Sequence, residues 1–210
     1  MPAINNGTCL LCKQEVQHRS IVKHLNKCLG MHANKKEQEK EKLFLIKVYD
    51  AEKLFWLFIE MNGSSPLGEL DFFLRKTWLE CCGHMSEFNI NGERYSNDRE
   101  LRKIIHRTFS VGDEFEYDYD FGSTTQLKGK IISTRAGKLP KKIRLLARNN
   151  LPADIKCTTC DKHPEVICSV CYDFCCKECK PEHNSCEGEE FLLPVVNSPR
   201  MGVCGYTGED

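Results

Sequence analysis

Eight cysteine and histidine side chains of the types that bind zinc lie between residues 157 and 186, in four pairs with a two-residue gap. Such a gap lets both side chains of a pair reach one ion from a tight turn. Four pairs supply two complete tetrahedral shells, whereas disulfide-rich domains rarely repeat pairs in this way. The predicted ligands are Cys157, Cys160, Cys168, Cys171, Cys176, Cys179, His183 and Cys186.

The spacing of the last four ligands predicts how the pairs share two ions. They step by three, four and three residues from Cys176 to Cys186. On a helix they would form a stripe about 15 Å long at 1.5 Å per residue, too long for one ion. We therefore expect the first pair to join the third and the second to join the fourth, which staples a segment too short to build a core. Cys175 is the alternative to Cys176, but the spacing to Cys179 favours Cys176.

The four pairs resemble the cross-braced fingers of the MYND, HIT and B-box types over about thirty residues. Those families mostly bind proteins. The resemblance therefore implies a protein partner for the C-terminal zinc module.

A second zinc motif lies near the N-terminus. A Cys-x2-Cys pair suits a hairpin knuckle, and a His-x3-Cys pair places both groups on the same side of a helix. The pattern predicts a small finger of two strands and a helix with an apolar stripe. Its ligands are Cys9, Cys12, His24 and Cys28, and its stripe is Ile21, Val22, Leu25 and Leu29. We expect His18 and His32 to be solvated surface histidines.

The twelve proposed ligands fill three zinc shells and leave no open position for a catalytic water. The sequence has no Gly-rich phosphate loop, no His-Glu-x2-His helix and no Gly-x-Ser-x-Gly elbow. We therefore expect a non-enzymatic adaptor with three zinc ions. The remaining cysteines are expected to be free thiols, and they are Cys81, Cys82, Cys175 and Cys204.

Composition and charge bear on compartment and partners. The chain has fourteen cysteines and no export signal, which fits zinc binding in a reducing cytosol, so a cytoplasmic protein is expected. No apolar run approaches eighteen residues, so no membrane span is expected. The net charge is zero, but residues 1–32 carry four basic residues against one acid, and residues 151–210 carry five against eleven. The finger is thus the one basic module, and weak contact with nucleic acid is expected there, whereas the acidic module points to protein contacts.

The chain divides into modules flanking a central domain. Strand-like and helix-like apolar periods in the middle predict the order strand, strand, helix, strand, helix, strand, strand. The first helix is expected to begin at Pro66, and Asn97-x2-Glu100 predicts a capping box at the start of the second. This order argues for an α+β domain with a mixed or antiparallel sheet, similar to a β-grasp. The expected divisions are a finger at 1–32, a charged linker at 33–42, the α+β domain at 43–150, the two-zinc module at 151–190 and a tail at 191–210.

The clearest hairpin joins residues 113–121 to 125–134. A three-residue loop sets Tyr119 opposite Leu127 and Asp118 opposite Lys128. Aromatic and acidic side chains then alternate between the two faces of the first strand. The aromatic face is Phe115, Tyr117, Tyr119 and Phe121, and the acidic face is Glu114, Glu116, Asp118 and Asp120. We expect a solvated acidic face neutralised by lysines. The enzyme alternative is a metal-dependent hydrolase or nuclease that uses these carboxylates.

The stretch from Tyr117 to Gly122 resembles the signature of the plasmid pRiA-type ORF-three-like family. The segment with His84, Phe88 and Asn91-Gly92 is also similar to that family, over roughly residues 43–135. The terminal stretch 197–208 looks like the tail of family members with an added zinc module. The resemblance implies a fold and an association with plasmids and insertion elements, without an established reaction.

Overall fold

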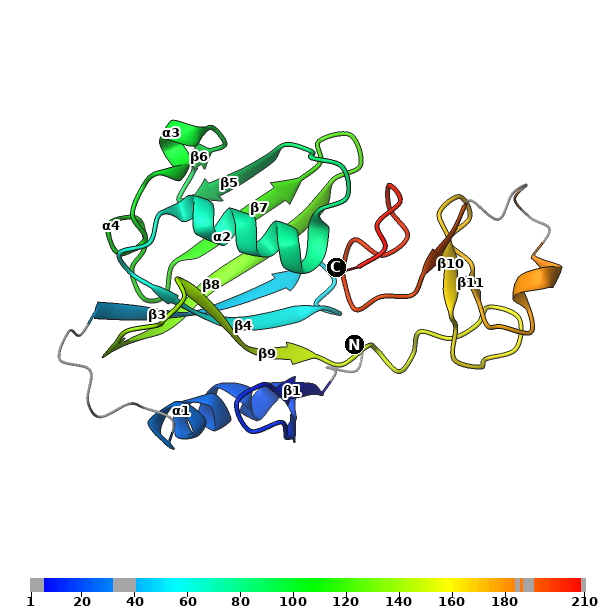
Figure 1. The fold of residues 1–210 in the computed structure, drawn as a ribbon, viewed down its shortest axis with the longest axis horizontal. Helices are drawn as coiled ribbons and strands as arrows, with labels where there is room; N and C mark the ends of the chain where they lie inside the picture. Colours follow the sequence, from blue (N-terminus) through cyan, green and yellow to red (C-terminus); the bar gives the residue numbers. More distant parts are fainter. Residues whose placement is uncertain (1–5, 32–40, 184–185, 187–190, 209–210) are drawn as a thin grey trace.

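The computed structural model describes residues 6–31, 41–183, 186 and 191–208. Within these residues the main feature is a nine-stranded sheet with the order β2-β1-β9-β4-β3-β8-β7-β5-β6, and all its pairings are antiparallel (Figure 1). Its strands are β1 (Gly7–Cys9), β2 (Glu15–Val16), β3 (Glu41–Asp50), β4 (Trp56–Asn62), β5 (Ser86–Ile90), β6 (Glu93–Tyr95), β7 (Glu114–Tyr119), β8 (Thr125–Gly137) and β9 (Ile143–Asn149). The predicted α+β class with an antiparallel sheet is confirmed, and the closer likeness to a β-grasp stays a prediction.

The longer helices lie on opposite faces of this sheet (Figure 1). The helix α2 begins directly after Pro66, one residue later than predicted, and continues as a turn of π-helix over Arg75–Leu79. Among the described residues, no helix combines the length and the apolar character that a membrane span requires. The α-helices are α1 (Ile21–Met31), α2 (Leu67–Leu74), α3 (Asp98–Leu101) and α4 (Ile105–Thr108).

The short helices and strands of the central domain agree with the sequence predictions in part. The predicted capping box is confirmed, because Asn97 accepts from the backbone of Glu100 and the Glu100 carboxylate accepts from the backbone of Asn97. The strand β6 and the helix α4 were not predicted. The strand β3 begins at Glu41, inside the stretch assigned to the linker.

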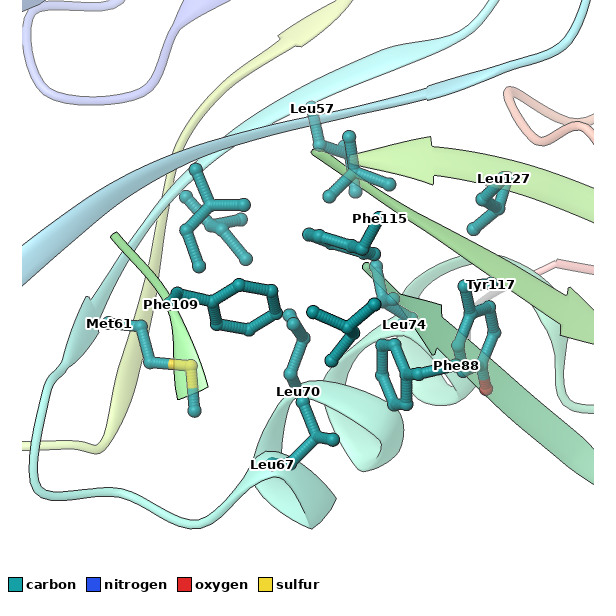
Figure 2. Close-up of a cluster of buried hydrophobic side chains, with 14 of the residues drawn as sticks. Leu57, Met61, Leu67, Leu70, Leu74, Phe88, Phe109, Phe115, Tyr117 and Leu127 are labelled. Atoms are coloured by element: carbon teal, nitrogen blue, oxygen red, sulfur yellow. The ribbon is translucent and has the colours of Figure 1, made fainter. Parts of the chain in front are cut away.

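The main core lies between α2 and the sheet. Leu67, Leu70 and Leu74 project from α2 onto aromatic side chains of the strands, among them Phe88 and Phe115 (Figure 2). All five side chains are at most 2% exposed. Burial of each large apolar side chain contributes about 1.5–3 kcal/mol, so the face of the sheet under α2 is the main source of stability for the central domain.

The N-terminal finger packs on the opposite face of the sheet. Ile21 and Leu25 of α1 lie in a cluster with Trp56 and Phe58 of β4. The strand β1 pairs with β9, and a side chain at Gly7 would overlap the Trp56 ring, so only glycine allows this close approach. The finger therefore extends the main sheet and shares a core with it.

The expectation that His18 is solvated is wrong. The ring of His18 lies 5.2 Å from that of Trp56 in an edge arrangement, and the side chain is partly buried. Burial, followed by the positive charge of Lys47, lowers the pKa of His18 to about 4. His32 lies outside the described residues.

The C-terminal module contains a separate three-stranded sheet, β11-β10-β12, beyond the edge of the main sheet (Figure 1). Its strands are β10 (Val166–Cys168), β11 (Phe174–Cys175) and β12 (Leu192–Pro194). The strand β12 pairs with β10, so this sheet includes the first residues of the segment assigned to the tail. The tail then returns to the central domain, where Asn197 and Asn149 exchange hydrogen bonds of 2.7 and 2.9 Å.

The predicted register of the β7–β8 hairpin is wrong by two residues. The structure pairs Tyr119 with Thr125, Tyr117 with Leu127 and Phe115 with Gly129. A shift of two residues preserves the two faces, so the aromatic side chains at 115, 117 and 119 are buried as predicted.

Two contacts account for the shift, one within the strand pair and one between the hairpin and the tail. A side chain at Gly129 would overlap the Phe115 ring, so the glycine provides the space that this ring occupies across the strand pair. Asp120 adopts a left-handed conformation with φ of 64° and leaves the strand, which lengthens the loop to residues 120–124. Its carboxylate accepts a 2.5 Å hydrogen bond from the guanidinium of Arg200 in the returning tail. The hairpin alone does not contain this interaction.

The same turn reverses two burial predictions. Phe121, expected on the core face, is 54% exposed, whereas Asp120, expected on the solvated face, is 5% exposed. The alternation of faces ends at Tyr119 because the backbone of Asp120 changes direction.

Substitution of the two phenylalanines distinguishes the observed hairpin from the predicted one. Phe115→Ala should lower the free energy of unfolding by about 3–5 kcal/mol, because a buried ring is lost. Phe121→Ala should change it by less than about 0.5 kcal/mol, because the ring is solvated. Urea unfolding of the zinc-loaded protein measures both, and equal losses would contradict the observed turn.

Candidate metal centres

Four groups of cysteine and histidine side chains in the described part of the chain lie close enough together to hold a metal ion. In each group, the four ligand atoms lie within 4.8 Å of one another. The groups are Cys9, Cys12, His24 and Cys28; Cys157, Cys160, Cys176 and Cys179; Cys168, Cys171, His183 and Cys186; and Cys81, Cys82, His84 and Cys204. The first three contain all twelve side chains that the sequence predicts as ligands.

The finger group joins a knuckle to a helix. Cys9 ends β1, and the chain turns back so that Cys12 faces α1. His24 and Cys28 lie one turn apart on α1, and the Nε2 atom of His24 is 3.3 Å from the sulfur atoms of Cys12 and Cys28. The predicted two-strand-plus-helix arrangement is confirmed.

The eight C-terminal side chains group as the spacing predicts, with the first pair beside the third and the second beside the fourth. Cys176 belongs to the first of these groups, whereas Cys175 is buried in β11 and lies in none of the four. A single turn of 3-10 helix over Lys180–Glu182 replaces the continuous helix considered for this stretch. The interleaved grouping follows instead from the short β10–β11 hairpin, which separates the pair Cys168 and Cys171 at its turn from Cys176 directly after β11.

The distances between donor atoms fit tetrahedral zinc. Zinc–sulfur bonds of about 2.3 Å at tetrahedral angles place the sulfur atoms about 3.8 Å apart. The sulfur of Cys160 lies 3.5 Å from those of Cys176 and Cys179. Cys171 lies 3.7 Å from the Nε2 atom of His183, close to the separation of about 3.5 Å expected for sulfur and nitrogen on one ion. These donor sets fit zinc, and the cysteines form no disulfides.

The thiols within these groups differ in how easily they ionise. Backbone hydrogen bonds lower the pKa of Cys157 and, against burial, that of Cys168 to about 6, whereas other thiols need a cation to ionise at neutral pH. Burial, together with the neighbouring Cys12 and Cys9, raises the pKa of Cys28 to about 11. Burial and the neighbouring Cys168 and Cys171 raise the pKa of Cys186 to about 12. Without a cation these thiols stay protonated at neutral pH, so zinc must displace protons and its affinity must fall as the pH falls.

The acidic strand does not form a comparable group. Within the described residues, the carboxylates of β7 are absent from the groups that could hold a metal ion. Lys130 lies 2.7 Å from Glu114, and Lys128 lies 3.6 Å from Glu116. Lys128 and Lys130 thus neutralise acids of this face, as predicted, but the shifted register pairs Lys128 with Glu116 in place of Asp118. Asp118 instead accepts a hydrogen bond of 3.1 Å from the neutral side chain of Gln126.

The fourth group was not predicted from the sequence, from which its cysteines were expected to be free thiols. Three of its members lie within four residues, after the π-helical turn that follows α2. The fourth, Cys204, lies in the tail and is 120 residues from His84. The cluster Cys-Cys-x-His was the one signal in the sequence, but its partner could be found only from the fold.

No family model matches the chain, and no curated protein matches it. One solved structure with partial similarity is a protein of unknown function from Methanosarcina mazei Go1, with 18% identity and a TM-score of 0.44, covering 52% of this chain and 68% of that one.

Removal of metal should loosen the finger from the sheet. Trp56 is 1% exposed and packs with α1, so a chelator should expose it to water and shift its fluorescence emission to longer wavelength. Structural zinc contributes on the order of 10 kcal/mol to such small modules. The strand signal of the central domain in circular dichroism should persist, because its core lies on the other face.

The Trp56→Phe variant is the control, since it retains Trp78 in the main core and should lose the shift. An unchanged emission spectrum after complete loss of zinc from the wild-type protein would show that the finger is held without metal.

Proposed function

We propose that this protein is a zinc-organised, non-enzymatic adaptor that binds a protein partner through its C-terminal module. The observation that carries the proposal is the donor sets of the three predicted groups, each with four sulfur or nitrogen atoms. Four such donors complete a tetrahedral shell and leave no position for a substrate or a reactive water. Zinc in these groups therefore has a structural role and holds surfaces in place.

The C-terminal module offers a surface suited to a protein. Val170 and Tyr172 flank Cys171 at the tip of a knuckle and are 55% and 57% exposed. Exposed apolar side chains held rigidly on a small scaffold are typical anchors of a protein interface. The segment 151–210 has six more acidic than basic residues, so a partner with an apolar pocket rimmed by basic side chains would complement it.

The central domain serves in this proposal as a rigid platform. We assign it to the plasmid pRiA-type ORF-three-like family with a β-grasp-like fold, on the strength of the residues around Tyr117–Gly122. An association with mobile elements and a cytoplasmic location belong to the same proposal. The metal-dependent hydrolase or nuclease remains a weaker alternative, because Glu114, Glu116 and Asp118 each have a polar partner.

The finger provides a weak site for nucleic acid in this scheme. Lys13, Arg19, Lys23 and Lys27 are exposed, and the last two lie one turn apart on α1. The apolar side of α1 is buried against the sheet, so only its outer side can meet a phosphate backbone. Four cations limit the affinity and give little sequence selectivity.

The partner surface can be tested by substitution at the knuckle. The double variant Val170→Ser with Tyr172→Ser should lose most of the proteins that the tagged wild-type chain captures from nuclease-treated native extract. Loss of two anchor side chains typically weakens binding by about 2 kcal/mol or more each. Quantitative mass spectrometry of the captured proteins is the readout.

Val111→Ser is the matched control, because Val111 is 54% exposed but lies on the central domain. The adaptor proposal fails if the double variant, with its zinc content intact, captures the same proteins as the control. It also fails if metal-dependent phosphoester hydrolysis appears and is lost in Asp118→Asn with Glu116→Gln.

Nucleic-acid binding should depend on α1. The variant Lys23→Glu with Lys27→Glu should abolish duplex DNA binding, and the wild-type logarithmic salt slope should not exceed about 3.6, at about 0.9 for each phosphate contact. Fluorescence anisotropy at several salt concentrations measures both. Unchanged affinity in the variant would assign the finger a purely structural role.

A further inference from the structure

The fourth Cys/His group joins two distant segments of the chain. The Nε2 atom of His84 lies 2.9 Å from the sulfur of Cys82 and 3.2 Å from that of Cys204. The sulfur of Cys82 lies 3.7 Å from those of Cys81 and Cys204. The sulfur separations match the tetrahedral value of about 3.8 Å for zinc, and they are far longer than a disulfide bond.

We propose that Cys81, Cys82, His84 and Cys204 bind a fourth zinc ion, which fastens the C-terminal tail to the central domain. The site is independent of the three predicted sites, because it shares no ligand with them. Its donor set of three thiolates and one imidazole is the same as that of the finger and of the second C-terminal group.

The histidine of this group is oriented as a zinc ligand. While Nε2 faces the sulfur atoms, Nδ1 lies 3.4 Å from Oδ1 of Asp120. A ligating histidine commonly donates its other N–H to a carboxylate, which fixes the ring and increases its basicity. The left-handed turn at Asp120 and the group at His84 therefore form one unit.

The loop that carries three of the ligands is held in place by hydrogen bonds that do not involve the ligand side chains. The Glu80 carboxylate accepts hydrogen bonds from the backbone of Gly83 at 2.5 Å and from the Tyr119 hydroxyl at 3.0 Å. Arg75 donates to Glu80 at 2.8 Å and to the backbone carbonyl of His84 at 2.6 Å. A preorganised loop loses little conformational entropy when it binds an ion.

A buried cation balances the charge of the site. Three thiolates around Zn²⁺ leave one negative charge, and Asp120 adds a second nearby. The guanidinium of Arg200 is fully buried and lies 3.7 Å from the sulfur of Cys81 and 2.5 Å from Asp120. Buried ionised groups are stable only when they are paired with an opposite charge. The positive charge of Arg200 therefore stabilises both the Asp120 carboxylate and the thiolates of the group.

The ion would act together with other contacts of the tail. Ser198 donates a 2.6 Å hydrogen bond to the carbonyl of Trp78, and Arg200 donates to the carbonyl of Ser123 at 2.6 Å. Cys204 follows within a few residues, so the ion closes a segment that already touches the central domain. The ion would therefore fix the returning chain against the loop that follows the π-helical turn after α2.

Native mass spectrometry of the reduced full chain with zinc tests the proposal. The wild-type protein should hold four ions, and both Cys204→Ser and His84→Ala should hold three. Cys175→Ala is the matched control, because Cys175 is the one described cysteine outside the four groups, and it should hold four ions. Hydrogen exchange of residues 197–208 should be faster in Cys204→Ser than in the control.

A second measurement on the wild-type protein does not depend on how the variants fold. Cys82 and Cys204 are exposed thiols, and in the zinc-loaded chain they should resist iodoacetamide until a chelator is added. Three ions in the wild-type chain, with rapid alkylation of both thiols, would overturn the fourth site alone. Fewer than three ions would instead contradict the zinc framework of the proposed function.

Discussion

Several thiols crowded within 4.8 Å of one another in these groups stay ionised at neutral pH only around a cation, and much of this structure depends on that constraint. Burial and neighbouring thiols raise the pKa of Cys28 to about 11 and that of Cys186 to about 12. A divalent ion reverses this preference by replacing mutual repulsion with attraction to one centre. The small segments around these groups bury too little apolar surface to hold such an arrangement by themselves.

The central domain is the part with the most independent stability. Its core under α2 is made of apolar side chains from an antiparallel sheet, and the finger adds both a strand and a second core on the opposite face. The tail contributes Arg200, whose buried ion pair with Asp120 lies beside the group at His84. The finger and the tail therefore both contact the central domain, and a group of side chains that could hold a metal ion lies at each contact.

The features that could be predicted from the sequence are those that depend on residues a few positions apart. Two-residue gaps identified the ligand pairs, and the step from Cys176 to Cys186 gave their interleaving without any structure. The capping box at Asn97 and the burial of Tyr117 also follow from neighbours in the chain. These features depend on the reach of a side chain over a few residues, which the sequence contains.

The failures involve partners distant in the sequence. The observed hairpin register differs from the predicted one where Asp120 leaves the strand and pairs with Arg200, eighty residues away. The same turn exposes Phe121 and brings the carboxylate to His84. Cys204 could not be matched to Cys82 for a similar reason, since only the returning tail brings them together. The alternation of apolar and polar residues along a strand contains no information about these distant partners.

X-ray absorption at the zinc edge of the fully loaded protein tests the central claim most directly, because it reports the atoms bound to the metal. The account predicts sulfur at about 2.3 Å and nitrogen at about 2.0–2.1 Å, with thirteen sulfur and three nitrogen ligands shared by four ions. Oxygen ligands in place of sulfur, or shells with an open position, would contradict it and return a catalytic metal to consideration.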